Sequence, residues 1–438
     1  MHARRAFFLG IGVILAVVAV RTALKVADNR SAFVRWQPQI RQMSEGVDIS
    51  AAYNYPNPPI MAVMLEPLAH LPPVVGAMLW FFLKAGLATL SLYWVIQMVQ
   101  EGDRPFPTWA WMLLVVCSLK PILDDLSHGN VNLLILFLVV ASLRAYTAGR
   151  EVLGGVVLAL AIACKVTPAL FVPYFVWKRS WKALAGCVVG IGLFLWPGVV
   201  PSLRLGFEDN QEQLVSWYRG MVHPFVVEGK VTSEHINQSL PGLVARLATH
   251  QPSFVAWVND VEQPMRYDNF LALSPTTAKR IVQSFLVAFA LLVVWVCRAG
   301  KDAPGWRRTA EFALIALGML LFSERTWKHH AVVLVLPFAV LVYALAQGLQ
   351  SAAWSRLQVG IISTALVLML LPALGRGRDR FESGRRPGLA KLSLAYGAYT
   401  GAFLLLSGGV VVLLRTGRRN DTSATIDMPA SGPTGVAA

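Results

Sequence analysis

Residues capable of chemistry are concentrated in a few short breaks between apolar stretches of this 438-residue chain. The richest break is 24–73, which begins with Asp28 and a basic, aromatic segment. The others are 124–132, Lys165 and 323–330. Ionisable groups at the ends of membrane helices are costly in lipid and usually face a cavity lined by protein. These breaks therefore predict one enzyme or transporter site that faces one side of a membrane.

Lys165 is a lone cation between two apolar stretches, 153–163 and 169–177, which are each short for a full crossing. We expect a pair of short or re-entrant helices that meet at Lys165. Its ammonium must then either find an anion, such as a phosphate, or extend to the water interface. The sequence leaves both alternatives open.

The composition indicates a polytopic membrane protein. The chain is 55% hydrophobic and 14% charged, with a mean hydropathy of +0.54. Apolar stretches of roughly 15 to 25 residues recur along it, near the length with which a helix crosses a bilayer, whereas a membrane barrel would show alternation. The net charge of +15 is spread over short loops, which favours membrane topology over nucleic-acid binding. The predicted fold class is all-α.

We expect about twelve membrane spans, with both termini in the cytoplasm. The spans are expected at 6–24, 74–99, 109–123, 131–143, 153–163, 169–177, 183–200, 277–297, 309–322, 331–346, 359–374 and 392–414. Arg4 and Arg5 hold the start of the first span in the cytoplasm by the positive-inside rule, so Lys25 and the residues after it lie outside. The protein is thus expected in the plasma membrane with an extracytoplasmic site.

Interfacial segments should cover this outer face. Phe33, Trp36, Ile40 and Met43 recur at helical spacing, which is typical of a helix lying in the membrane interface. The polar stretch 202–276 is too long for a structureless loop, so it should fold over the same face.

The chain is expected to form a single membrane domain, 1–419, and a disordered cytoplasmic tail, 420–438. The basic loop 375–387 should be outside, against the charge rule, so either the span count is off by one or the loop binds anionic head groups; we prefer the second. The four cysteines lie in or beside apolar spans without metal-ligand spacing, so they predict packing. No metal or cofactor is expected.

Four short motifs together resemble glycosyltransferase family 87, the polyprenyl-phosphate-mannose-dependent mannosyltransferases with the C-type transferase fold. Residues 128–132 resemble the family's Gly-Gln-x-Asn motif, with Asn130 in place of Gln, and 162–168 resemble its Ile-Lys-x-x-Pro motif. Residues 55–68 resemble its Tyr-x-x-Pro-Pro and Pro-Leu segments. Residues 323–330 resemble its Ser-x-x-Trp-x-His-His segment, with Glu-Arg-Thr before the Trp. The resemblance covers roughly residues 20 to 350.

The resemblance implies transfer of a sugar from a polyprenyl phosphate to a glycolipid or glycan acceptor, with inversion. Such a reaction needs a carboxylate for the acceptor proton and cationic groups for the departing phosphate. Asp28 matches the family's acidic residue and is the expected base; its alternative is an N-cap of the next helix. A transporter or flippase is the alternative function, but no convincing inverted repeat is visible.

The remaining candidates are polar or aromatic residues of the same outer face. Lys165, His329 and His330 are expected to bind the donor phosphate, although two interfacial histidines also occur simply at span ends. The substrate is expected to contact Asn130, Asn132, Tyr55, Asp124 and Asp125, and the two aspartates are also the rivals of Asp28 as the base. The alternatives are helix caps for the asparagines, solvated turn positions for the aspartates, and an interfacial aromatic belt for Tyr55, Trp217 and Tyr218.

Overall fold

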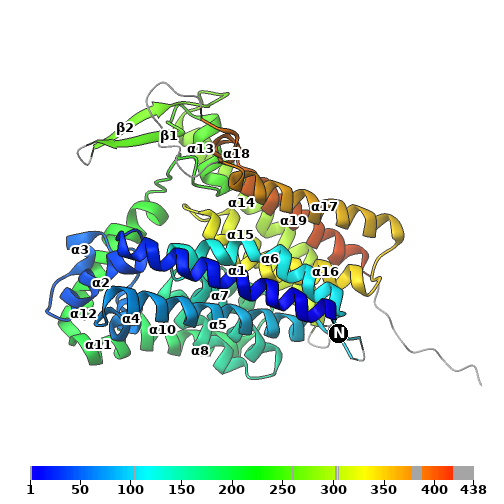
Figure 1. Cartoon of the computed structure of the whole chain (residues 1–438), viewed down its shortest axis with the longest axis horizontal. Coiled ribbons are helices and arrows are strands. Elements are labelled where there is room, and N and C mark those ends of the chain that lie inside the picture. Colours follow the sequence, from blue (N-terminus) through cyan, green and yellow to red (C-terminus); the bar gives the residue numbers. More distant parts are fainter. Residues whose placement is uncertain are drawn as a thin grey trace, which may run out of the picture.

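The computed structural model describes residues 2–102, 104–258, 261–300, 303, 305–375 and 387–417. These residues form a helical bundle with one small hairpin (Figure 1), so the predicted all-α membrane architecture is confirmed. Seven stretches of this part are long and apolar enough to cross a membrane. They are Arg4–Ala27, Pro73–Val99, Trp181–Leu205, Pro275–Val296, Lys328–Ala346, Ala352–Ala373 and Ala398–Thr416.

These stretches correspond to the following helices, of which the α-helices are labelled in Figure 1. They are α1 (His2–Ala27), α5 (Pro73–Val99), α10 (Trp181–Phe194) with α11 (Val199–Leu205), α14 (Pro275–Val296), η3 (Lys328–Leu334) with α16 (Val335–Ala346), α17 (Ala352–Leu370) with η4 (Leu371–Ala373), and α19 (Ala398–Thr416). Most of the other predicted spans form helices that are shorter or less apolar. These are α6 (Thr108–His128), α7 (Asn132–Thr147), α8 (Glu151–Cys164) and α15 (Gly305–Leu321). The last predicted span, 392–414, divides into α18 (Leu389–Ala395) and α19.

Helices α15 and α16 form the centre of the bundle. Nearly every residue of α16 is buried, because the helix is apolar all round, as a helix enclosed by other helices must be. Helices α8 and α10 pack closely through small residues, and a side chain at Gly155 or Gly186 would strike the backbone of the other helix.

The chain breaks at Lys165 as expected. Helix α8 ends at Cys164, and a 3₁₀ turn, η1 (Thr167–Leu170), leads into the short helix α9 (Phe171–Trp177). Pro168 lies within the η1 turn, where its missing N–H costs nothing. The predicted pair of short helices meeting at Lys165 is confirmed.

Short helices gather at the end of the bundle where α1 finishes, away from the N-terminus (Figure 1). They are α2 (Ala32–Met43), α3 (Ile49–Tyr53), α4 (Pro59–Ala69) and α12 (Phe207–Trp217), together with α11. The four apolar positions that predicted α2 are all buried in it. Arg204 of α11 forms an ion pair with Glu66 of α4, which ties two of these helices together.

The long polar stretch is folded, as predicted, but it contains a hairpin that the sequence analysis did not expect. After a π-helical segment, η2 (Tyr218–Val227), the chain forms α13 (Leu240–Ala248) and two antiparallel strands, β1 (Phe254–Val258) and β2 (Val261–Arg266). Helix α18 packs beside α13 (Figure 1). We call α13, β1, β2, α18 and the segment 228–239 the cap. The hairpin is short and irregular in register, so its pattern in the sequence is weak.

Arg246 is the organising residue of the cap. Its side chain is 0% exposed, and its guanidinium donates to the backbone carbonyls of Ser233, Glu234, Asn237, Leu394 and Ala395 at 2.6–3.4 Å. These carbonyls come from both the long stretch and α18. Gln238 adds a hydrogen bond from its Nε2 to Leu394 O at 2.8 Å. Tyr399 N–H and Thr400 Oγ1 of α19 donate to Oε1 and the carbonyl of Gln238 at 3.1 and 2.8 Å, so the cap is joined to the last helix.

Acid is expected to weaken the cap through His235, whose ring stacks on Phe254 at 4.2 Å. Burial and the charge of Arg246 lower the pKa of His235 to about 4, whereas an unfolded histidine titrates near 6.5. Between these values only the unfolded chain binds the proton, so stability is lost as the pH falls through this window. From pH 7 to pH 5 the free energy of unfolding should fall by about 2 kcal/mol.

Thermal unfolding at the two pH values checks this prediction. His235→Gln should remove most of the acid sensitivity, whereas His250→Gln, at an exposed histidine between α13 and β1, should leave it intact. Equal acid sensitivity of His235→Gln and the natural protein would contradict the assignment.

Two other predictions fall outside the described residues. The basic positions of the 375–387 loop lie at 376–386, and the predicted tail lies at 420–438.

Candidate active site

A buried ion pair between α5 and α6 anchors the candidate site. Lys84 Nζ lies 3.0 Å from Asp125 Oδ1, and both side chains are 0% exposed. The same ammonium donates to the carbonyls of Asp125 and Asn130, each at 2.9 Å. An unpaired buried charge would strongly destabilise the fold, so each partner of this pair compensates the charge of the other.

The turn from α6 to α7 is held by this lysine and its neighbour Trp80. Trp80 Nε1 donates to the carbonyl of Gly129 at 3.2 Å. Gly129 ends α6 in the left-handed conformation, with φ 77°, and a side chain there would strike the Ser31 hydroxyl. Asn130 Oδ1 accepts from the N–H of Val131 at 2.7 Å, which leaves its amide nitrogen free to point away from the turn.

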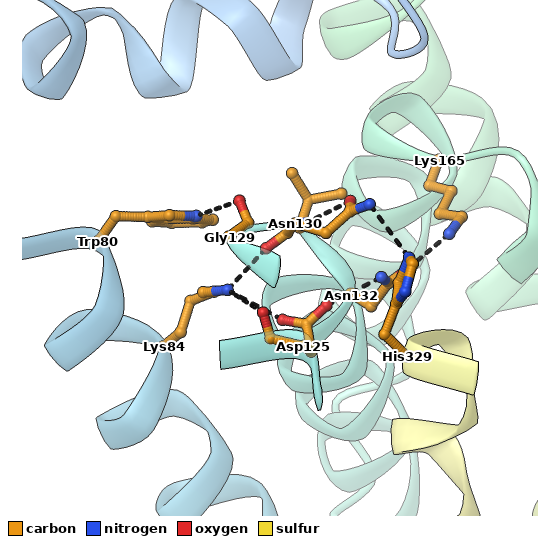
Figure 2. A network of polar contacts seen from close by, with 9 residues as sticks. Trp80, Lys84, Asp125, Gly129, Asn130, Asn132, Lys165 and His329 are labelled. Atoms are coloured by element: carbon orange, nitrogen blue, oxygen red, sulfur yellow. Dashed lines mark hydrogen bonds and ion pairs between the residues drawn. The ribbon is translucent and has the colours of Figure 1, made fainter. Parts of the chain in front are cut away.

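A second set of contacts runs from Asp125 to Lys165 (Figure 2). Asn132 Nδ2 donates to Asp125 Oδ2 at 2.9 Å, and Lys165 Nζ donates to Asn132 Oδ1 at 2.5 Å. Lys84, Asp125, Asn132 and Lys165 therefore form one connected polar chain across α5, α6, α7 and the end of α8.

Three histidines meet at the other side of the turn. The ring of His128 stacks on that of His329 at 4.4 Å, and Asn130 Nδ2 lies 3.3 Å from His329 Nε2. Because an amide nitrogen only donates, this geometry leaves His329 Nδ1 to carry the ring proton. His330 accepts from the N–H of Trp327 through Nδ1 at 3.4 Å, which fixes its ring at the start of η3.

A cavity of about 600 Å³ opens beside these groups. Its polar lining residues are Arg35, Asn57, His128, Asn130, Lys165, Ser323, Glu324, Arg325 and His330, and Trp36, Trp217 and Trp327 line it as well. Its apolar lining residues include Val166, Leu170, Pro173, Met221, Val222, Phe225, Val226, Met319 and Phe322. The cavity is therefore amphiphilic and suits a ligand with a polar head and an apolar chain.

Five of the predicted site residues lie in the lining of this cavity or next to it. Asn130, Lys165 and His330 line it. Asn132 lines an adjoining space of about 20 Å³ together with Lys165 and His330. His329 lies behind, 4% exposed, against His128 and Asn130.

Tyr55 and the two neighbouring aspartates lie outside the lining. Tyr55 is 1% exposed and packs edge-on against Trp36. Asp124 pairs with Lys120 one helical turn earlier on α6, and Asp125 pairs with Lys84. The structure thus gives both aspartates protein partners within or beside α6 in place of the exposed turn that was their alternative.

Asp28 is exposed in the turn between α1 and α2, outside the cavity lining. The N-cap position of α2 is Ser31, so the helix-cap alternative for Asp28 is wrong. Lys25 Nζ donates to Ser127 Oγ at 2.6 Å, and Ser31 lies against Gly129. The turn that carries Asp28 therefore lies against the turn that carries His128 and Asn130.

The sequence analysis missed Lys84, Arg35 as a cavity residue, and Glu324 as the one carboxylate among the described residues that line the cavity. Lys84 had a clear signal. It is the single acidic or basic residue in the 27 residues of α5, and a charge within a membrane helix is by default a candidate for function.

Comparison with known proteins agrees with this picture. The family model described as Glycosyltransferase family 87 matches residues 55–324. A polyprenol-phosphate-mannose-dependent alpha-(1-2)-phosphatidylinositol mannoside mannosyltransferase of Mycolicibacterium smegmatis is 26% identical over 326 residues, which are 69% of this chain and 63% of that protein. The protein of the same description from Mycobacterium tuberculosis is 24% identical over 342 residues, 74% of this chain and 68% of that protein.

A third relative, from M. smegmatis, is a polyprenol-phosphate-mannose-dependent alpha-(1-2)-phosphatidylinositol pentamannoside mannosyltransferase. It is 24% identical over 292 residues, which are 66% of this chain and 60% of that protein. The chain thus spans between three fifths and about two thirds of the length of these three curated relatives.

Proposed function

Because the chain belongs to glycosyltransferase family 87, we propose that it transfers mannose from a polyprenyl-phosphate mannose to a lipid-linked or cell-envelope glycan acceptor. The reaction takes place at the extracytoplasmic face of the plasma membrane and inverts the anomeric centre. The relatives are described as dependent on polyprenol-phosphate mannose and as acting on phosphatidylinositol mannosides, which supports this donor and a glycolipid acceptor.

The observation that carries the proposal is a cavity lined by both polar and apolar side chains. A polyprenyl-phosphate sugar has an anionic head and a long apolar chain. The lining includes cations, imidazoles and amides together with aliphatic and aromatic side chains. The anionic head matches the cationic and polar groups through charge, and the prenyl chain matches the apolar groups through burial of apolar surface.

Lys165 is the main candidate for the phosphate. An ammonium has three donors, and the Asn132 amide oxygen is its one hydrogen-bond partner within the described part of the chain. Asp125 forms its ion pair with Lys84, and no ion pair is formed by Lys165 within the described residues. A bound phosphate would give Lys165 a direct anionic partner, with His330 also in the cavity lining and His329 behind it.

Asp28 acts as the general base. The acceptor hydroxyl oxygen forms a bond to the anomeric carbon while the bond from that carbon to the phosphate oxygen breaks. The acceptor proton passes to Asp28, and the electron pair of the broken bond leaves with the polyprenyl phosphate, which Lys165 and the histidines stabilise. Asn130, which lines the cavity, contacts sugar hydroxyls.

Reconstitution tests this proposal. The purified chain in nanodiscs would be incubated with polyprenyl-phosphate [¹⁴C]mannose and a phosphatidylinositol mannoside, and the product anomer would be determined by NMR. We expect a labelled glycolipid with the α configuration, opposite to that of a β-linked donor. An intact donor after incubation would refute the transfer, and movement of unaltered donor between leaflets of liposomes would identify a flippase.

A further inference from the structure

We propose that Lys84 is a positioning residue for mannosyl transfer, because it holds Asn130 and Lys165 in place at the cavity through its ion pair with Asp125. The inference rests on the function proposed above and assigns a role to the charge at the centre of α5. Neither Lys84 nor Asp125 lines the cavity, and both are fully buried. Lys84 therefore acts through other residues, without touching the substrate.

The first effect of Lys84 is on the turn between α6 and α7. Its ammonium binds the carbonyl of Asp125 in the last turn of α6 and the carbonyl of Asn130 beyond the end of that helix. A single cation thus closes the turn from both ends. The side chain of Asn130 is fixed in the same place, between the N–H of Val131 and the ring of His329.

The second effect runs through Asn132. A carboxylate only accepts hydrogen bonds, so Asp125 must face the amide nitrogen of Asn132. The amide oxygen then points the other way, toward the ammonium of Lys165 (Figure 2). The orientation of Asn132, and with it the position of Lys165, therefore depends on the Asp125 carboxylate, which the ion pair with Lys84 holds in place.

A purely structural role would require the pair to stabilise the fold without affecting the site. Two observations argue against it. All three acceptors of the Lys84 ammonium lie in the segment 125–130, which leads directly into the cavity wall. A buried ion pair is also a weak source of stability compared with well-packed apolar residues, so its presence needs another explanation.

The test is the double variant Lys84→Met/Asp125→Asn, which removes both charges and leaves no unpaired ion. Asparagine at 125 can present either its oxygen or its nitrogen to Asn132, so the orientation of Asn132 is no longer fixed. We expect kcat to fall about tenfold or more, since small displacements of positioned groups have effects of this size. The KM for the acceptor and the midpoint of thermal unfolding should stay near those of the natural protein.

A control is available in a second ion pair outside the cavity lining. Lys178 and Glu311 lie 2.8 Å apart, with side chains 12% and 0% exposed, and neither residue lines the cavity. Lys178→Met/Glu311→Gln should keep kcat in the folded fraction, whatever its effect on stability. An equal loss of kcat in this control, or an unchanged kcat in Lys84→Met/Asp125→Asn, would overturn the inference.

A measurement that does not depend on mannosyl transfer distinguishes this inference from the proposed function. Acetic anhydride modifies Lys165 at a rate that peptide mass spectrometry can follow. We expect faster modification of Lys165 in Lys84→Met/Asp125→Asn than in the natural protein, because Asn132 no longer holds the ammonium. An unchanged rate would refute the positioning role even if the natural protein transferred no mannose, and the absence of transfer alone would refute only the proposed function.

Discussion

Asp28→Asn is expected to reduce mannosyl transfer by about 10²- to 10⁴-fold, the range in which general base catalysis contributes to enzyme rates. Asparagine has the same shape as aspartate but cannot take the acceptor proton. Asp28 is exposed, so the variant should fold and bind donor normally. Single-turnover transfer with labelled donor measures the effect. Productive hydrogen bonds to a base commonly form only in the substrate complex, so the position of Asp28 outside the cavity lining does not exclude this role.

Glu324 is the rival base, because it is the carboxylate that lines the cavity within the described residues. Glu324→Gln should therefore reduce transfer far less than Asp28→Asn. Asp209→Asn, at an exposed position in the first turn of α12, is a matched control that should have no effect. If Glu324→Gln abolished transfer while Asp28→Asn remained active, the base would be Glu324.

Lys165→Met is expected to lower kcat by about 10²- to 10³-fold, as the loss of a preorganised group that stabilises developing charge commonly does. The substitution keeps the length and apolar stem of the side chain but removes the ammonium that faces the leaving phosphate. Donor affinity should fall as well, whereas acceptor affinity should not. Binding of polyprenyl phosphate and initial rates at varied donor concentration measure the two effects.

Lys182→Met provides the control for this prediction, since Lys182 is exposed on α10 and lies outside the cavity lining. It should change neither kcat nor donor binding. A Lys165→Met variant that binds and turns over the donor like the natural protein would show that Lys165 serves the structure of the break between α8 and η1.

Several features of the site could be predicted from local sequence. Lys165 stands between two apolar stretches too short to cross a membrane, so a break there could be expected from length alone. The spacing of Phe33, Trp36 and Ile40 likewise predicted α2. Asn130 and His330 were selected because their segments resemble family motifs. In the structure, both residues line the same cavity.

Other features depend on contacts between distant parts of the chain. Lys84 and Asp125 are 41 positions apart, and no local pattern indicates that α5 and α6 bring them together. Asp124 and Asp125 looked alike in the sequence, yet one pairs with Lys120 and the other is buried against Lys84. The difference arises because adjacent helical residues point about 100° apart, so only one of them faces α5.

The sequence by itself determined that this protein is a helical membrane protein, where its main break lies, and which family it resembles. These properties depend on the length and hydrophobicity of each stretch and on the spacing of residues within it. Membrane insertion and helix formation respond to these local features. Only the tertiary structure decided which polar residues face the cavity, which neutralise one another, and that the cavity lining combines polar with apolar side chains. These properties depend on how the helices pack, because packing alone determines which charges are close enough to pair and which remain available for substrate.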